Sequence, residues 1–161
     1  MSAKTKSDHK MWLMKSEPTE YSIDDLQCDV NTMWDGIRNY QVRNMMRDEM
    51  TVGDKALFYH SNTDQIGVVG EMEIAKKAYP DPTQFNVKDK HFDQKSTKKN
   101  PRWLCVDVRY IKKFPRIVTL NEMRNEKSLK DMKLLQKGSR LSITSVSKSQ
   151  YEKIVAMAYK K

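Results

Sequence analysis

Six short runs of the sequence place polar, charged and, in four of them, aromatic residues at the ends of predicted elements, a mixture that suits the binding of a flat, polar ligand. They are residues 15–18, 34–40, 59–61, 78–81, 101–103 and 139–142. An aromatic ring can stack on a nucleic-acid base, and hydroxyl, amide and charged groups can form hydrogen bonds to the base edge. Each run also has a purely structural interpretation, as a core tryptophan, a turn or a surface ion pair. The ligand-binding interpretation therefore depends on whether the runs meet in space.

The motifs of the common enzyme classes are missing from the sequence. It contains no Gly-x-x-x-x-Gly-Lys, Gly-x-Gly-x-x-Gly, Gly-x-Ser-x-Gly or His-Glu-x-x-His. Among the three histidines, His60 alone falls at the end of a predicted strand, and a lone histidine there is more often a hydrogen-bonding residue than a general base. Cys28 and Cys105 are too few for a disulfide framework or a cysteine zinc site. We expect neither a metal nor another cofactor.

Positive charge is concentrated in the second half of the chain. The 161 residues carry a net charge of +9. Residues 1–80 contain 10 lysines and arginines against 13 aspartates and glutamates, whereas residues 81–161 contain 20 against 8. Such asymmetry indicates a polyanionic partner such as nucleic acid, because each neutralised phosphate releases bound counterions, although a well-solvated lysine-rich surface is the alternative. No stretch approaches the roughly 20 apolar residues of a membrane span, so no membrane partner is expected.

The elements that must position these residues can be predicted from local patterns. Apolar and alternating runs predict strands over residues 11–17, 55–61, 66–75, 102–111 and 139–143, with a hairpin joining the second and third. Capping residues predict helices that begin at Ser22, Asn39, Thr119 and Ser147. Residues 1–10 are predicted to be a disordered basic tail, and the polar residues 88–100 also lack an apolar period. Residues 11–159 then form one α+β domain built on a small, partly closed barrel.

The motifs as a set resemble one family. The runs Trp-Leu-Met-Lys-Ser-Glu-Pro from residue 12, Trp-Asp-Gly-Ile-Arg-Asn-Tyr from residue 34, Phe-Tyr-His-Ser-Asn, Gly-Val-Val-Gly, Ala-Tyr-Pro-Asp, Pro-Arg-Trp and Gly-Ser-Arg-Leu-Ser are similar, in order and spacing, to the EVE-domain family. That family resembles the PUA-like superfamily, which also holds the YTH readers of methylated adenine. The resemblance implies a PUA-like pseudo-β-barrel of short mixed strands flanked by helices, with a recessed pocket. It also implies a nuclear reader of modified bases, notably modified cytosines in DNA, with RNA left open.

Together with this resemblance, the residue types predict a pocket for one flipped base and a basic rim. Trp34 is expected to form a stacking wall with Tyr59 or Trp103 nearby. Hydrogen-bonding groups are expected from Lys15, Ser16, Asn39, His60 and Ser142. The rim or floor is expected to include Ser61, Tyr79, Asp81 and Leu141. Flanking phosphates are expected to contact Arg38, Arg43, Arg102, Lys112 and Arg140.

Two other functions remain open. A small hydrolase acting on a modified nucleobase or nucleoside could draw a nucleophile and an acid from Lys15, Ser16 and Glu17. Neighbours on a strand face opposite sides, however, so Ser16 is expected to point away from the other two. We therefore favour binding over turnover. The third possibility is a protein-interaction module without a small ligand.

Overall fold

Six strands form one mixed sheet in the computed structural model, which describes residues 9–160. The strands are β1 (Met11–Ser16), β2 (Asn31–Trp34), β3 (Lys55–His60), β4 (Gly67–Pro80), β5 (Leu104–Thr119) and β6 (Ile143–Val146), in the spatial order β2-β5-β4-β3-β1-β6. β1 pairs with β3 in parallel, and the other pairings are antiparallel. The α+β class is confirmed. Over the described residues the sheet is not closed into a barrel, and β2 and β6 are its edges.

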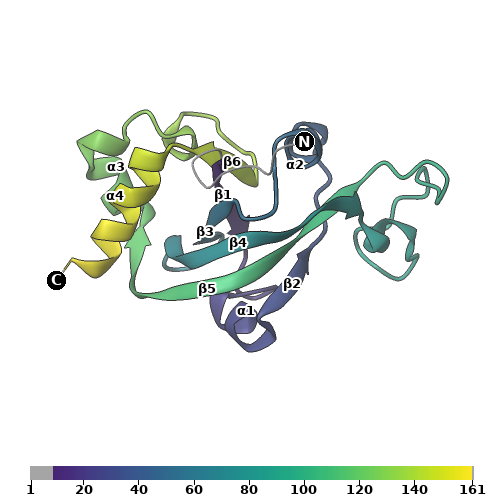
Figure 1. Cartoon of the computed structure of the whole chain (residues 1–161), viewed down its shortest axis with the longest axis horizontal. Helices are drawn as coiled ribbons and strands as arrows, with labels where there is room; N and C mark the ends of the chain where they lie inside the picture. The colour runs from purple at the N-terminus through teal and green to yellow at the C-terminus, as the bar shows by residue number, and fades with distance from the viewer. Residues whose placement is uncertain (1–8, 161) are drawn as a thin grey trace.

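The long strands β4 and β5 curve through the middle of the molecule (Figure 1). They extend beyond the predicted ranges, and their register shifts at four points. Bulges of this kind bend and twist a strand pair without ending it, which explains why a single pair runs so far. The curl of the sheet matters for the site, because it brings strands from its two halves toward each other.

Two of the strand predictions need correction. The four-residue β2 was not predicted, because it is short and begins with the polar residues Asn31 and Thr32, so it shows no clear alternation of apolar and polar side chains. The last strand was predicted over residues 139–143 but spans Ile143–Val146. Residues 139–142 are exposed or half-buried, and their link to β1 is a bond from the Lys15 amide to the Ser142 carbonyl at 2.9 Å.

All four predicted helix starts are confirmed. The helices are α1 (Ile23–Asp29), α2 (Tyr40–Asp48), α3 (Leu120–Asn125) and α4 (Lys148–Tyr159), with short 3-10 turns at Pro82–Phe85, Lys127–Leu129 and Lys133–Leu135. Ser22, Asn39, Thr119 and Ser147 each accept a backbone N–H from the first helical turn. A capping side chain satisfies a donor that would otherwise be unpaired, so it fixes where the helix begins.

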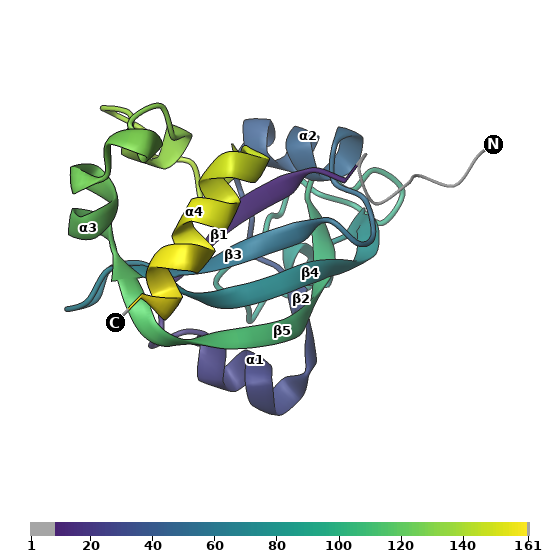
Figure 2. The ribbon, with the colours of Figure 1, turned by 60° about the vertical axis from the view of Figure 1, so that its left-hand side comes forward.

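The sheet separates two apolar clusters. One contains Trp34 and Phe58 with residues of α1 and α2, and the other contains Leu57 and Tyr59 with residues of α3 and α4. Figure 2 shows α4 lying across one face of the sheet, with α1 at the far edge. Successive side chains of a strand point to opposite faces, so neighbouring residues of β3 belong to different clusters.

The polar segment over residues 88–100 follows a defined path of turns instead of lacking structure. The Asp93 amide donates to the Gln84 carbonyl at 3.0 Å, and the Asp93 carboxylate accepts from the Trp103 indole at 2.7 Å. Residues 1–8 of the predicted basic tail lie outside the described residues. Between residues 9 and 160, no helix is long and apolar enough to cross a membrane.

Candidate functional site

A hollow of about 460 Å³ opens where the ends of β1 and β2 approach each other. Three strands separate β1 from β2 in the sheet, so the curl of the sheet brings them to one place. The volume lies within the roughly 300–1,000 Å³ typical of small-ligand pockets. Five predicted site residues line the hollow: Lys15, Ser16, Trp34, Arg38 and Ser142. The hollow is also lined by Glu17, Glu20, Tyr21, Thr32, Met33, Asp35, Gly36, Ile37, Lys90 and His91.

Trp34 is both a core residue and a wall of the hollow. Its side chain is 7% exposed and meets Phe58 edge to face, with ring centres 5.4 Å apart. Its indole N–H has no hydrogen-bond partner among residues 9–160. This N–H is not fully buried, so a ligand in the hollow can reach it. The expected partner Tyr59 lies in the other apolar cluster, because β3 turns Phe58, one residue earlier, toward Trp34.

The loop that follows Trp34 is anchored by the buried carboxylate of Asp81. This carboxylate accepts hydrogen bonds from the Gly36 amide at 2.8 Å, from Arg38 Nη1 at 3.1 Å, and from both the amide and the hydroxyl of Thr83. Burial alone would raise the pKa of Asp81, but the hydrogen bonds from Thr83, Gly36 and Arg38 outweigh it and lower that pKa. An ionised Asp81 therefore fixes the course of residues 35–38.

Gly36 is required at its position in this loop. Its φ is +81°, and a Cβ added there would lie 2.7 Å from Cε1 of His91. A side chain would therefore be strained by its backbone and would collide with the imidazole. The close approach of Gly36 and His91 joins the loop to the 88–100 segment at the wall of the hollow.

Asp35 places a carboxylate in the hollow without a partner. Its side chain is exposed, and no hydrogen bond or ion pair to it is found within residues 9–160. Partial loss of hydration raises the pKa of Asp35, and the negative charge of Asp81 adds to the effect. A carboxylate in this state is a ready acceptor for an N–H donor. Sequence reasoning interpreted Asp35-Gly36 as a turn and missed this side chain, although its place directly after Trp34 was a usable signal.

The end of β1 supplies the opposite wall. Ser16 donates its hydroxyl to the Tyr21 carbonyl at 2.6 Å, so this hydroxyl is engaged within the protein. Lys15 is half-buried, its Nζ lies 5.9 Å from the centre of the Tyr59 ring, and burial lowers its pKa. The Glu17 carboxylate accepts from the Asn62 side chain at 2.9 Å, so it is engaged away from Lys15.

Several predicted pocket residues hold the fold and do not line the hollow. The Asn39 side chain accepts from the Val42 amide at 3.0 Å and so caps α2. His60 accepts from the Ile23 amide at Nε2, 3.1 Å away, and burial lowers its pKa, so the imidazole is neutral and ties α1 to β3. The Tyr79 hydroxyl donates to Asp107 at 2.5 Å.

The remaining predicted residues also lie beside the hollow or beyond it. The Ser61 amide donates to the Ser16 carbonyl at 3.0 Å, and Leu141 packs against the cluster that contains Trp34. Trp103 stacks on Tyr40, with ring centres 4.6 Å apart. None of these three residues lines the hollow.

The predicted phosphate contacts fall into three groups. All three guanidinium nitrogens of Arg38 donate within the protein, to His91, Ile37, Asp81 and Thr83. Arg43 and Arg102 flank the exposed ring of Tyr40, and Arg140 is exposed. Lys112 lies over the ring of Tyr159, 4.8 Å from its centre, and does not line the hollow.

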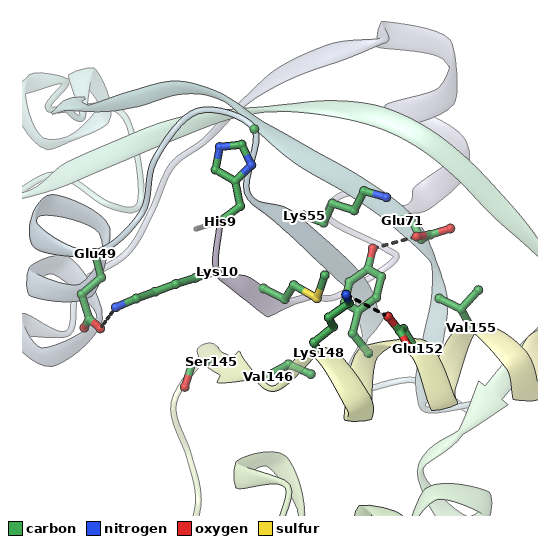
Figure 3. A pocket seen from close by; sticks show the side chains of 13 residues that line it. His9, Lys10, Glu49, Lys55, Glu71, Ser145, Val146, Lys148, Glu152 and Val155 are labelled. Atoms are coloured by element: carbon green, nitrogen blue, oxygen red, sulfur yellow. Dashed lines mark hydrogen bonds and ion pairs between the residues drawn. The ribbon is translucent and has the colours of Figure 1, made fainter. Parts of the chain in front are cut away.

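A larger hollow, of about 900 Å³, lies elsewhere and shares no residue with the first (Figure 3). Most of its charged groups are already paired: Lys10 with Glu49 at 3.0 Å, and Lys148 with Glu152 at 3.8 Å. Its aromatic side chain, Tyr151, is 3% exposed and donates to Glu71. Size alone therefore does not select the site; the 460 Å³ hollow is the one that combines an aromatic residue whose indole N–H has no partner among residues 9–160, Trp34, with the unpaired carboxylate of Asp35.

The chain is similar to proteins of one family along almost its whole length. The family model for the EVE domain matches residues 10–157. Thymocyte nuclear protein 1 from Gallus gallus is 38% identical over 93% of this chain and 69% of its own length, and the Homo sapiens protein is 38% identical over 92% and 74%.

Solved structures agree with the sequence comparison. A hypothetical protein from Leishmania major matches with a TM-score of 0.90 and 42% identity, over 96% of this chain and 97% of that one. Human THYN1, solved in complex with DNA containing 5-methylcytosine, matches with a TM-score of 0.88 and 37% identity, over 94% and 99%. With the family's motifs in order, the sheet in place and a match that spans nearly all of its length, the chain belongs to the EVE-domain family.

Proposed function

We propose that this chain is a nucleic-acid-binding domain that recognises a modified cytosine in DNA, flipped into the hollow between Trp34 and Asp35. The observation that carries the proposal is the pairing of an aromatic wall with an unpartnered carboxylate in one hollow. The human relative solved with 5-methylcytosine DNA supports the same ligand class. The relatives' name supports a nuclear location.

The energetics explain why both groups are needed. Taking a base out of a duplex costs a few kcal/mol, and one aromatic stacking contact returns roughly 1–3 kcal/mol. Hydrogen bonds to the base edge must supply the rest. Cytosine presents an amino donor at N4, which Asp35 can accept, whereas thymine presents an oxygen there that the carboxylate repels. Met33 and Ile37 line the same hollow and offer apolar surface to a 5-methyl group.

Flanking phosphates would be held by cations that, apart from Lys90, do not line the hollow. The half-buried Arg43 and Arg102 and the exposed Arg140 are candidates, and the 88–100 segment adds the exposed lysines Lys88, Lys90, Lys95, Lys98 and Lys99. These contacts position the strand without specifying its sequence. Arg38 instead has a positioning role, since its guanidinium connects Asp81 to His91.

Asp35→Asn should remove the discrimination between cytosine and thymine. The wild-type protein is expected to prefer the modified cytosine over thymine at one position of an otherwise identical oligonucleotide by about 1–3 kcal/mol, or roughly 5- to 150-fold. An asparagine can also donate to the thymine oxygen, so the preference should fall below about threefold. Fluorescence anisotropy with oligonucleotides that differ in one base measures it. Asp64→Asn, at an exposed carboxylate that does not line the hollow, is the matched control.

Incubation of the protein with modified cytidines separates binding from catalysis. The Ser16 hydroxyl donates to a carbonyl and not to a base, so nothing around it activates a nucleophile. We expect modified cytidines to be recovered unchanged after long incubation. Time-dependent product formation that disappears in Lys15→Ala would overturn the binding assignment in favour of a hydrolase.

Lys15→Met should stabilise the fold while weakening DNA binding. Because burial lowers the pKa of Lys15, the unfolded chain holds this proton more tightly than the folded one. The charged lysine therefore costs stability below its folded pKa, and the cost is relieved as the pH rises toward the ordinary value of 10.5. We expect a rise in Tm at neutral pH, which shrinks as the pH rises toward 10.5.

Thermal unfolding between pH 6 and 10 and anisotropy at neutral pH test this pair of effects. Lys137→Met, at an exposed lysine that does not line the hollow, controls for the loss of one charge. A variant that is less stable and binds equally well would show that Lys15 is a structural residue only.

A further inference from the structure

An exposed aromatic residue lies next to the hollow. Phe92 is 39% exposed and follows His91, which lines the hollow. Cα atoms of neighbouring residues are about 3.8 Å apart, so the backbone of Phe92 lies beside the wall of the hollow. Phe92 is a member of neither apolar cluster found among residues 9–160. Single apolar residues on a surface are common, so exposure by itself does not give Phe92 a role.

The backbone is fixed on both sides of Phe92. Before it, the carbonyl of His91 accepts from Arg38 Nε at 3.0 Å and from Arg38 Nη2 at 2.7 Å. After it, the amide of Asp93 donates to the carbonyl of Gln84 at 3.0 Å, and Gln84 is fully buried. A ring on such a backbone is presented in a defined place, so binding through this ring loses little free energy to the ordering of the chain.

The charged side chains near this ring are divided by sign. The carboxylates are engaged within the protein: Asp89 accepts from the amide two residues later at 2.8 Å, and Asp93 accepts from the Trp103 indole at 2.7 Å. Lys88 and Lys95 are exposed, and their ammonium groups have no partner among residues 9–160. Figure 1 shows this part of the chain, between β4 and β5, projecting beyond those strands. The ring is therefore presented on a projecting segment with free positive charge, which suits the phosphates of DNA.

We propose that Phe92 is a wedge that enters duplex DNA and fills the gap left when the modified cytosine turns into the hollow. An empty step in a duplex loses the stacking of the bases on either side, and an inserted apolar side chain restores part of it. A wedge must lie beside the pocket, because the gap and the flipped base belong to the same nucleotide. Lys88 and Lys95 hold phosphates next to that step. This inference rests on the proposed function, since the gap forms only when a base is flipped.

A comparison of duplex and single-stranded DNA tests the wedge. Both oligonucleotides carry one 5-methylcytosine in the same sequence, and Phe92→Ser removes the ring. Affinity for the duplex should fall about 5- to 150-fold, the equivalent of one aromatic stacking contact. Affinity for the single strand should change less than about twofold, because a single strand has no gap to fill. Equal losses on both oligonucleotides, or no loss on the duplex, would overturn the proposal.

A bulged duplex removes the gap without any change to the protein. When the 5-methylcytosine has no nucleotide opposite it, the flanking base pairs can close on each other after the base turns out. Phe92→Ser should then bind within about twofold of wild type. A loss as large as on the fully paired duplex would show that the ring contacts another part of the DNA, and the wedge would be wrong.

Two further variants test the position and the chemistry of the ring. Phe92→Leu keeps an apolar side chain and should retain duplex affinity within about threefold of wild type. Val52→Ser is the matched control: it removes an apolar side chain that is 53% exposed, next to Gly53 of the larger hollow, and should leave both affinities unchanged. Both serine variants should keep the Tm of wild type, because both sites are exposed. Equal duplex losses in Phe92→Leu and Phe92→Ser, or in Val52→Ser and Phe92→Ser, would contradict the wedge.

The mononucleotide 5-methyl-dCMP distinguishes the two proposals. Wild type and Phe92→Ser should bind this mononucleotide equally, because it fills the hollow and has no neighbouring bases. If wild type binds neither the mononucleotide nor the oligonucleotides, the proposed function itself is wrong. If wild type binds all of them and Phe92→Ser binds the duplex equally well, the wedge alone is wrong.

Discussion

Asp81→Asn is expected to lower the free energy of unfolding by about 3–5 kcal/mol, the range found when one partner of a buried ion pair is removed. Asp81 is fully buried and accepts from Gly36, Arg38 and Thr83. An asparagine would present its own amide N–H groups to these donors and would leave the Arg38 charge without its partner. Urea unfolding at pH 7 measures the loss. Asp48→Asn, in the exposed pair with Arg47, is the control and should leave stability nearly unchanged, because water screens an exposed ion pair.

The same substitution should change how the free energy of unfolding depends on pH in acid. The folded pKa of Asp81 lies below its ordinary value of 3.8, so its stabilising effect is complete above that pH and is lost as the pH falls toward the folded pKa. Stability of the wild type should therefore fall more steeply than that of the variant below about pH 4. The anchoring role of Asp81 would be contradicted if wild type and variant lost stability at the same rate below about pH 4. It would also be contradicted if the substitution lowered the free energy of unfolding by less than about 1 kcal/mol at neutral pH.

Trp34→Ala should weaken both folding and binding. The indole belongs to the core beside Phe58, so its removal is expected to cost about 3–5 kcal/mol of stability. Its loss from the wall of the hollow should cost a further 1–3 kcal/mol in binding to modified DNA. The structure thus combines two roles that sequence reasoning treated as alternatives, which means that lost binding in this variant alone does not identify a base contact.

A pair of leucine variants separates the two roles. Trp34→Leu and Trp12→Leu both replace a core tryptophan, but Trp12 is fully buried, donates to Asp54 and does not line the hollow. Both should lower Tm. At a temperature where both remain folded, binding of modified DNA should weaken at least fivefold in Trp34→Leu and less than twofold in Trp12→Leu. Equal affinities in the two variants would remove Trp34 from the ligand site.

Local signals were the part of the structure that the sequence predicted well. Helix starts at Ser22, Asn39, Thr119 and Ser147 are set by contacts within three residues, so they can be read without knowledge of the fold. The bounds of β6 could not be predicted in this way, because they depend on its pairing with β1, which is distant in the sequence. The short β2 depends in the same way on pairing with β5.

The site was predicted in part, for a similar reason. Lys15, Ser16, Trp34 and Ser142 lie at element ends, and the curl of the sheet brings those ends together. Tyr59 was expected beside Trp34, but a shift of one residue along a strand places a side chain on the other face. Asp35 was not predicted to line the hollow, because Asp-Gly is also a common turn sequence.

The most direct test of the central claim is an NMR titration of the indole N–H signals with 5-methyl-dCMP. The protein has three tryptophans. The indoles of Trp12 and Trp103 donate to Asp54 and Asp93, whereas that of Trp34 lines the hollow. We expect a large, saturable shift of the Trp34 signal, nuclear Overhauser contacts between its ring and the 5-methyl group, and little change at Trp12 and Trp103. Saturable binding that leaves the Trp34 signal in place would contradict it.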